Sequence, residues 1–412
     1  MQSFSFSSFN FFLRRKHGET RDPVAPFDRK SDFNFTLLSL APLACYLNNY
    51  SAIKSSMKIF SATLFFLLPL VQSSAAPSSL IRLEERDFGG LDDGSTVRQF
   101  LLRNENGMTV GVISYGAIIT EIQVPDRKGN VRNVIAGSQY LDDYLGPFPA
   151  AAVIGRFANR IKDGRFKIDG QDYQVTQNAR ANHIHGGTKG FAKVNWNAKA
   201  LPVSETEAGV VFSYFSEDGE EGYPGNLIAT VTYTLNDQNE LSLAYTAKTD
   251  KPTIINLTNH AYFNLANGGG FEDHILWLNA HHYTLADSDL LPTGELATVS
   301  GSPFDFTVPQ TIGWRLDQIG EPHPNKYDDN FVIKAGRNQL VVAARVHEPE
   351  SGRLMEVRTD QPGIQLYTGN KHGFCLETQH YPDSINHPQF PSPIVRPSKP
   401  FKSTTQFVFS IQ

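Results

Sequence analysis

The 412-residue sequence lacks the signatures of several large classes of proteins. It has only two cysteines, Cys45 and Cys375, which excludes a disulfide framework apart from one possible bridge. The formal charge is −5, and no run of Lys and Arg forms the basic stripe that nucleic-acid binding needs. A G-x-S-x-G nucleophile elbow is absent, and no phosphate-binding glycine loop follows a strand. A serine hydrolase and a nucleotide-binding enzyme therefore have little support.

Long helical patterns and internal repeats are missing too. The chain instead has 32 Gly, 24 Pro and many Thr, Val and Phe, a composition typical of β-rich proteins. Short alternating segments are separated by turn signals, such as Asp169-Gly170 between 165–168 and 171–175. The sequence predicts an all-β fold, with one large antiparallel domain arranged as a β-sandwich.

The N-terminal region differs from the rest of the chain. Residues 57–76 have a basic start, an apolar run over 59–71 and a small-residue end, the pattern of a secretory signal peptide. That run is shorter than the ~20 residues that span a bilayer. We expect translation to begin at Met57, with 1–56 an upstream extension and cleavage near Ala75 or Ala76. A long leader or an internal signal anchor is the alternative. The mature protein, 77–412, would be secreted, free of the membrane, and left with one thiol, Cys375.

The stretch 256–265 carries an unusual set of polar residues. Read as one strand, it has a polar face made of Asn256, Thr258, His260, Tyr262 and Asn264. Such a face offers hydrogen-bonding groups of fixed geometry and one residue that titrates near neutral pH. This suits a groove for a polar, uncharged ligand, and it equally suits a structural histidine in a polar sheet.

Glu377 lies in the otherwise apolar strand predicted over 374–379. A carboxylate there needs a partner or a ligand. If it is partly buried, its pKa is biased upward, in the direction that a general base near neutral pH requires. A salt-bridged residue at a sheet edge is the alternative interpretation.

His183 and His185 form an H-x-H motif, which resembles part of a metal site. A metal site needs three or four ligands, and residues 186–192 offer no carboxylate, so we expect no metal. The chain has enough carboxylates for the pair that a glycosidase uses, although an acidic turn such as 218–221 is usually a solvated loop. These carboxylates are Asp218, Glu220, Glu221, Asp328, Asp329 and Glu377.

Seven motifs in order give the chain, from about residue 88 to its end, a resemblance to the aldose 1-epimerase (galactose mutarotase) family. They are 155–161 (GRFANRI), 184–187 (IHGG), 218–225, 256–265, 328–331 (DDNF), 361–370 and 373–379 (GFCLETQ). The resemblance implies that 77–412 is the aldose 1-epimerase domain, with a galactose mutarotase-like supersandwich and an open sugar groove. It also implies no cofactor and a reaction that interconverts α and β anomers of free aldoses such as glucose and galactose.

The resemblance also assigns roles to residues. Glu377 would be the general base at the anomeric hydroxyl, and His260, as an imidazolium favoured by the nearby carboxylate, the general acid at the ring oxygen. His185 would hydrogen-bond the sugar near the reacting end. The remaining hydroxyls would be held by Asn159, Arg160, Asp328 and Gln365. Nothing in the sequence fixes the oligomeric state.

Some features depart from the family pattern or leave alternatives. Asp329 stands where relatives commonly have His, and His183 is unusual; neither is assigned a role. Asn256-Leu257-Thr258 is a glycosylation sequon that we expect to be unmodified, because a glycan there would fill the groove. A non-catalytic sugar-binding protein on the same fold, and an epimerase for phosphorylated hexoses, remain open. The latter would want added Arg or Lys at the groove.

Overall fold

The computed structural model describes residues 80–334 and 339–412. The predicted upstream extension and signal peptide lie outside these residues. Within them, strands predominate and the helices are six short 3-10 turns. No helix in this described part of the chain has the length and apolar character needed to cross a membrane. The predicted all-β class is therefore confirmed.

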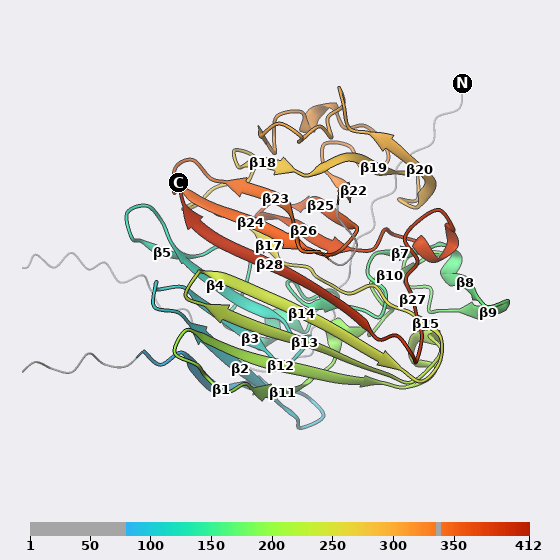
Figure 1. The fold of residues 1–412 in the computed structure, drawn as a ribbon, viewed down its shortest axis with the longest axis horizontal. Helices are drawn as coiled ribbons and strands as arrows, with labels where there is room; N and C mark the ends of the chain where they lie inside the picture. The colour runs from blue at the N-terminus through green and yellow to red at the C-terminus, as the bar shows by residue number, and fades with distance from the viewer. Residues whose placement is uncertain (1–79, 335–338) are drawn as a thin grey trace, which may run out of the picture. The chain divides into compact units, whose positions relative to one another are not determined.

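The strands are numbered in chain order (Figure 1). They are β1 (Leu83–Gly90), β2 (Thr96–Arg103), β3 (Thr109–Ile113), β4 (Ile119–Pro125), β5 (Val131–Asn133), β6 (Val153–Ile154), β7 (Arg160–Ile161), β8 (Arg165–Ile168), β9 (Gln171–Gln174), β10 (His183–Ile184), β11 (Asn197–Ala200), β12 (Glu207–Ser216), β13 (Leu227–Asn236), β14 (Glu240–Thr249), β15 (Thr253–Ile254), β16 (Thr258–Asn259), β17 (Tyr262–Phe263), β18 (Ile275–Leu278), β19 (Ala280–Ala286), β20 (Pro292–Thr298), β21 (Gln310–Thr311), β22 (Asp328–Ile333), β23 (Val341–His347), β24 (Arg353–Thr359), β25 (Gly363–Asn370), β26 (Gly373–Gln379), β27 (Ile394–Val395) and β28 (Phe401–Ile411). The 3-10 helices are η1 (Leu141–Tyr144), η2 (Lys162–Gly164), η3 (Phe191–Lys193), η4 (Glu220–Gly222), η5 (Leu316–Gln318) and η6 (Ser384–Asn386).

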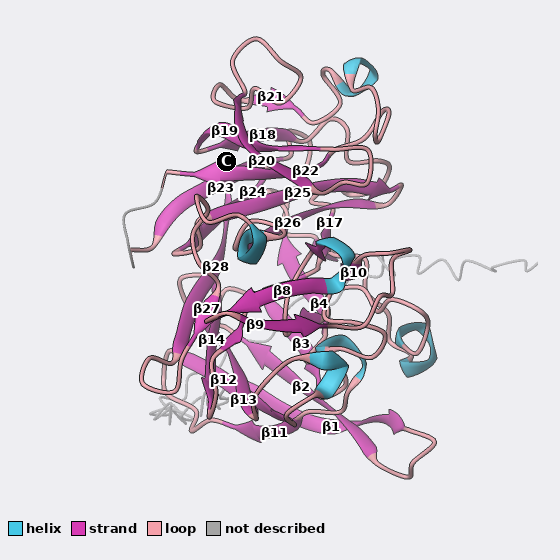
Figure 2. Ribbon diagram, turned by 90° about the vertical axis from the view of Figure 1, so that its right-hand side faces the viewer, coloured by secondary structure: helices cyan, strands magenta, loops and turns pink. Residues whose placement is uncertain are grey.

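Three large antiparallel sheets form the body of the described chain. Their strand orders are β1-β2-β3-β4-β5, β11-β12-β13-β14-β28-β24-β23-β18-β21 and β17-β26-β25-β22-β19-β20. Four two-stranded ladders complete the set: β7 with β10, β6 with β16, β15 with β27, and β8 with β9. Figure 2 shows the short helices lying in the loops that join these strands.

The nine-stranded sheet packs against both of the other large sheets. Phe212 on β12 meets Phe100 on β2 edge to face, with ring centroids 5.9 Å apart. Farther along, Phe407 on β28 packs on Phe263 of β17, with centroids 5.1 Å apart. These contacts belong to one large buried core, as the period-2 alternation of inward apolar residues requires.

Local turn chemistry explains the hairpins. Asp169 and Gly170 have φ values of 51° and 84°, the left-handed geometry that a two-residue turn needs, and they join β8 to β9 as predicted. β13 with β14 and β23 with β24 also form antiparallel hairpins. The tight β25–β26 hairpin places Gln365 directly opposite Glu377.

The prediction that 256–265 forms one continuous strand is wrong. The stretch contains two separate two-residue strands, β16 and β17, with β15 just before it. β16 pairs with β6, whereas β17 pairs with β26 in the six-stranded sheet. His260 lies between these two short strands, where the chain passes from one sheet to another. The residues of 256–265 therefore do not divide into one polar face and one apolar face of a single strand.

Candidate active site

One pocket gathers most of the predicted site residues. It is a concave site that is partly open to solvent. Its lining consists of Phe148, Asn159, Arg160, Ile184, His185, His260, Tyr262, Asp328, Tyr367 and Glu377. Gln365 is the one predicted residue that does not line it. Gln365 lines a small adjoining pocket, which shares Asn159, Arg160 and Asp328 with the first.

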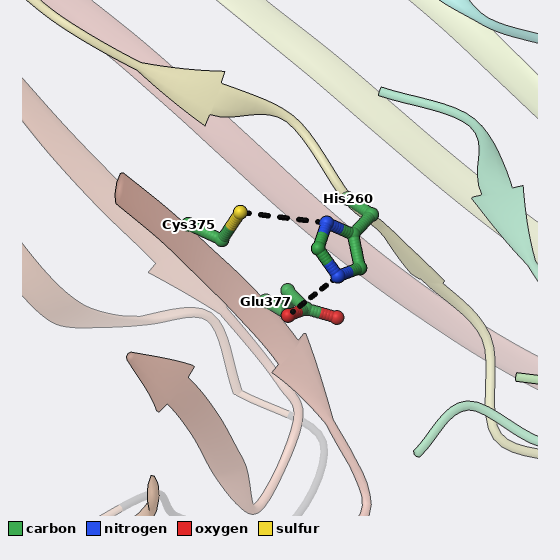
Figure 3. Close-up of side chains that lie close together, drawn as sticks. All are labelled: His260, Cys375 and Glu377. Carbon is green, nitrogen blue, oxygen red and sulfur yellow. Dashed lines mark hydrogen bonds and ion pairs between the residues drawn. The ribbon is translucent and has the colours of Figure 1, made fainter. Parts of the chain in front are cut away.

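Glu377 and His260 meet at the inner wall of this pocket (Figure 3). His260 Nε2 lies 3.4 Å from Glu377 Oε1, and the two residues are only 4% and 2% exposed. Strand alternation puts Glu377 on the same face of β26 as Cys375, whose Sγ lies 3.4 Å from His260 Nδ1. Glu377 Oε2 is buried and has no hydrogen-bond partner among the described residues.

Burial governs the protonation of this pair. It raises the pKa of Glu377 well above its usual 4.5, and the negative charge of Asp328 adds to the rise while Arg160 opposes it. The direction is the one expected for a general base. Burial also lowers the pKa of His260 to about 4, which outweighs the expected help from the carboxylate. A lone charge on either group is therefore unfavourable, and the stable arrangement is a neutral pair that shares one proton.

The β7–β10 ladder positions the opposite wall. It pairs Arg160 with Ile184, so Asn159 and His185 emerge side by side, both in the left-handed region with φ of 60° and 51°. His185 N–H donates to the Asn159 carbonyl at 3.1 Å, and Asn159 N–H donates to His185 Nδ1 at 3.2 Å. Because Nδ1 accepts a hydrogen bond, the proton of the neutral ring is on Nε2. Burial keeps the ring neutral by lowering its pKa well below 6.5.

Gly186 explains how the chain turns away after His185. Its φ is 84°, and an added Cβ would lie 1.8 Å from the carbonyl oxygen of Gly155. Only glycine fits such a position. The close approach of these two glycines brings the segments 155–160 and 183–187 together, and these segments form the wall opposite His260 and Glu377.

Asp328 is held by two neighbours rather than standing free. Gln365 Nε2 donates to its Oδ1 at 2.8 Å, and Asp329 Oδ2 accepts its backbone N–H at 3.0 Å. Burial raises the pKa of Asp328, against the influence of Arg160. Asp329 in turn faces His323, with Oδ1 and Nε2 3.4 Å apart. Asp329, which stands where relatives commonly have His, thus helps to hold the pocket residue Asp328 in place.

Phe148 is the one lining residue of this pocket that lies outside the seven sequence motifs. It lies in the loop after η1, is 39% exposed, and has its ring centroid 4.8 Å from that of His260 and 5.3 Å from that of His185. Phe148 stands between Pro147 and Pro149, and an aromatic residue so placed in a loop is the only signal that could have indicated it. Its exposed ring can cover an apolar face of a ligand.

His183, in contrast, is structural. Its Nδ1 lies 2.6 Å from the carbonyl oxygen of Thr176, and its Nε2 lies 2.5 Å from the hydroxyl of Tyr223. Burial lowers its pKa to about 4. Both ring nitrogens are thus engaged, which leaves neither of them to join His185 in holding a metal ion.

The acidic turn 218–221 also lies outside the pocket. Asp218 pairs with Lys251, Glu220 accepts the hydroxyl of Tyr214 at 2.6 Å, and Glu221 accepts the N–H of Lys189 at 2.7 Å. Each carboxylate stabilises the local fold. None of the three contributes to the pocket lining, so they do not supply a glycosidase pair.

Asn256 does not line the groove, contrary to the prediction. It is 0% exposed. Its Nδ2 donates to the carbonyl oxygens of Ala158 and His380, and its Oδ1 accepts the N–H of His380 at 2.8 Å. The side-chain amide of Asn256 thus joins the segments around Ala158 and His380 inside the protein. It replaces hydrogen bonds that a regular sheet would supply to their backbone groups. A glycan is still not expected on this residue, but the reason is burial rather than blockage of the pocket.

Comparisons with known proteins agree with this geometry. The family model described as aldose 1-epimerase matches residues 98–408. Galactose mutarotase of Homo sapiens is 44% identical over 344 residues, which cover 79% of this chain and 97% of that protein. Aldose 1-epimerase of Escherichia coli (strain K12) is 34% identical over 337 residues, covering 77% and 96%. The crystal structure of galactose 1-epimerase from Lactobacillus acidophilus NCFM superposes with a TM-score of 0.70 at 29% identity, covering 80% of this chain and 98% of that one.

Proposed function

The chain belongs to the aldose 1-epimerase family and is a mutarotase, an isomerase that interconverts the α and β anomers of free aldohexoses, and we propose that Glu377 and His260 perform its two proton transfers. The observation that carries this proposal is the buried contact of 3.4 Å between Glu377 Oε1 and His260 Nε2 on the pocket wall. A pair that shares one proton can accept a proton from one oxygen and give a proton to another without a change in its net charge.

Ring opening uses the pair as carboxylate and imidazolium. Glu377 takes the proton of the anomeric hydroxyl, and His260 gives its Nε2 proton to the ring oxygen. The bond between the anomeric carbon and the ring oxygen breaks, and the electron pair of the hydroxyl forms the aldehyde. Rotation about the bond to the neighbouring carbon presents the other carbonyl face. Closure reverses both transfers: His260 takes the proton of the attacking hydroxyl, and Glu377 returns its proton to the carbonyl oxygen.

Burial suits both transfers. The raised pKa of Glu377 makes the carboxylate a stronger base, and the lowered pKa of His260 makes its imidazolium a stronger acid. The ion-pair form is accessible because it is neutral as a whole, so only its internal charge separation is disfavoured. Acid and base catalysis of this kind contributes typically ~10²–10⁴-fold for each group, which suffices for a reaction that already runs in water.

The other residues hold the sugar. His185 offers its Nε2–H as a donor near the reacting end, because Asn159 fixes its tautomer. Arg160 donates to hydroxyl groups, and Asp328 accepts from them. Gln365 acts through Asp328, since its amide donates to that carboxylate rather than lining the main pocket.

Two alternatives have less support. Among the described lining residues of both pockets, Arg160 is the one Arg or Lys, and Asp328 stands beside it. A phosphorylated hexose would want more positive charge than one arginine beside a carboxylate provides. A non-catalytic sugar-binding protein would gain nothing from a desolvated carboxylate with an unpartnered oxygen, which costs folding free energy.

Polarimetry with freshly dissolved α-glucose and α-galactose tests the proposal. Pure protein should accelerate the optical change, and Glu377→Gln should reduce the acceleration by at least ~10²-fold, because an amide cannot accept the proton. Glu207→Gln is the matched control, since the same chemical change then falls on an exposed residue of β12. Circular dichroism checks that both variants are folded. Undiminished activity of Glu377→Gln would reject the assigned role.

We also propose that the enzyme is exported after cleavage near Ala75 or Ala76. The support is the signal-like sequence of 57–76 and the state of Cys375, the single thiol of 77–412, which is fully buried. A buried thiol is protected from the oxidants of the extracellular space. N-terminal mass spectrometry of the secreted protein tests this, and a mature terminus upstream of Met57 would reject the proposed start site.

A further inference from the structure

Cys375 is a buried thiol whose position beside His260 has no part in the proton transfers described above. Its Sγ lies 3.4 Å from His260 Nδ1, whereas Glu377 contacts the other ring nitrogen, Nε2 (Figure 3). The thiol and the carboxylate thus each contact a different nitrogen of the His260 ring. All three residues are buried, with Cys375 0% exposed.

A cluster of Cys, His and Glu also raises the question of a metal ion. The ligand atoms of the three residues lie within 4.8 Å of one another. A single ion, however, must lie in line with the lone pair of one imidazole nitrogen. Here the sulfur contacts Nδ1 and the carboxylate contacts Nε2, so neither ring nitrogen is the contact of both other groups. The geometry fits a separate hydrogen bond at each ring nitrogen better than chelation.

The proton count decides the direction of the sulfur contact. In the neutral pair, one proton is shared between Glu377 and Nε2 of His260, whichever of the two holds it. In both arrangements Nδ1 must carry its own proton. The sulfur is therefore the acceptor of Nδ1–H, and a thiol that burial keeps protonated is a weak acceptor.

We propose that Cys375 is a positioning residue for the reaction: its sulfur accepts the Nδ1–H of His260 and keeps that proton in place, so that every exchange occurs at Nε2. This inference rests on the proton-transfer role proposed for His260. Mutarotation requires the same nitrogen to give a proton during ring opening and to take one during closure. If Nδ1 lost its proton instead, Nε2 would keep one and could no longer accept.

The weakness of the acceptor has a consequence of its own. A carboxylate behind a catalytic histidine stabilises the imidazolium, as in Ser-His-Asp triads. A neutral sulfur gives much less stabilisation, so the imidazolium of His260 stays acidic and readily protonates a weakly basic ring oxygen. The backbone of His260 is fixed separately, because its N–H donates to Ala152 and its carbonyl accepts from Ala151. Cys375 thus orients the imidazole ring of His260 and does not hold its backbone.

The first test is spectroscopic and uses the unmodified enzyme. Long-range proton–nitrogen correlation spectra of protein labelled in histidine report which nitrogen of a neutral ring carries the proton, and His260→Gln assigns the signal. We expect the Nδ1–H form in the wild type. An Nε2–H form would overturn the proposal even if Glu377→Gln abolishes activity, in which case the proposed function still stands. If Glu377→Gln is fully active, the proposed function itself fails.

The second test compares substitutions at Cys375. Cys375→Ala removes the acceptor and should lower kcat about tenfold with KM nearly unchanged, which is the scale of one lost hydrogen bond. Cys375→Ser keeps an acceptor and should restore kcat to within about threefold of the wild type. Leu376→Val, on the opposite face of the same strand, is the control for packing and should leave kcat unchanged. Equal kcat in the Ala and Ser variants, or an equal loss in Leu376→Val, would show that the sulfur only fills space.

Discussion

The buried pair of His323 and Asp329 makes a quantitative prediction about pH and stability. Both residues are about as buried as the core, at 4% and 5% exposure, and their nearest atoms lie 3.4 Å apart. His323 Nδ1 also lies 2.9 Å from the carbonyl oxygen of Lys326. Burial alone would lower the pKa of His323, but the hydrogen bond and charge of Asp329 outweigh it and raise the pKa from 6.5 to about 9. The protonated form is therefore bound more tightly in the folded protein.

The size and sign of the effect follow from that pKa. Each unit of pKa corresponds to ~1.4 kcal/mol, so the rise gives about 3 kcal/mol of stability at most. A raised pKa means that the folded state binds the proton more tightly than the unfolded state. The contribution is thus complete below pH 6.5 and disappears as the pH rises through about 9. Replacing His323 by Gln should cost most at the acidic end of this window and little above it.

Urea unfolding of wild type and His323→Gln across this pH range measures the difference. Other titrating groups are common to both proteins, so they largely cancel in the difference between the two free energies of unfolding. His282→Gln, at an exposed histidine of β19, is the control and should show no such trend. A difference for His323→Gln that is the same below pH 6.5 and above pH 9 would refute the ion pair and leave only packing.

Two further predictions concern the pocket and the sequon. Phe148→Ala should raise KM about fivefold with little change in kcat, because the lost aromatic contact is worth ~1 kcal/mol and Phe148 neither gives nor takes a proton. Steady-state polarimetry measures both constants, and a large fall in kcat would contradict this. Asn256 should be free of sugar in the secreted protein, since its amide is fully buried and bonded on both sides; intact-mass analysis that finds a glycan there would show that the segment is not packed as described.

The fold class and several hairpins could be predicted because they depend on local chemistry. The Asp169-Gly170 turn needs only two residues that accept positive φ, and β13 and β14 show the alternation of a half-buried strand. Glu377 could be singled out for a similar reason, since a carboxylate among apolar strand residues is costly unless something binds it.

Sequence patterns were less informative where burial and polarity coincide. Arg156 and Arg160 are four residues apart in one motif, yet Arg156 is 2% exposed and donates to five acceptors, among them Ser216 and Gly225. Only Arg160 reaches the pocket. An arginine that holds loops together and one that binds a ligand look alike in the sequence. The same ambiguity affected the acidic turn 218–221 and His183, whose partners include Lys251, Lys189 and Tyr223 from other segments of the chain.

The misread stretch 256–265 shows why a site can look more polar than it is. Where the chain leaves one sheet for another, its backbone groups and those of its neighbours lose their strand partners, and buried side chains must replace them. Asn256 does so for Ala158 and His380, and Asn259 does so for Ala151 at 2.7 Å. Ala151 also donates to the carbonyl of His260. Much of the polar signature is therefore scaffolding that fixes His260 from both sides, and the irregular backbone is what brings its ring to Glu377.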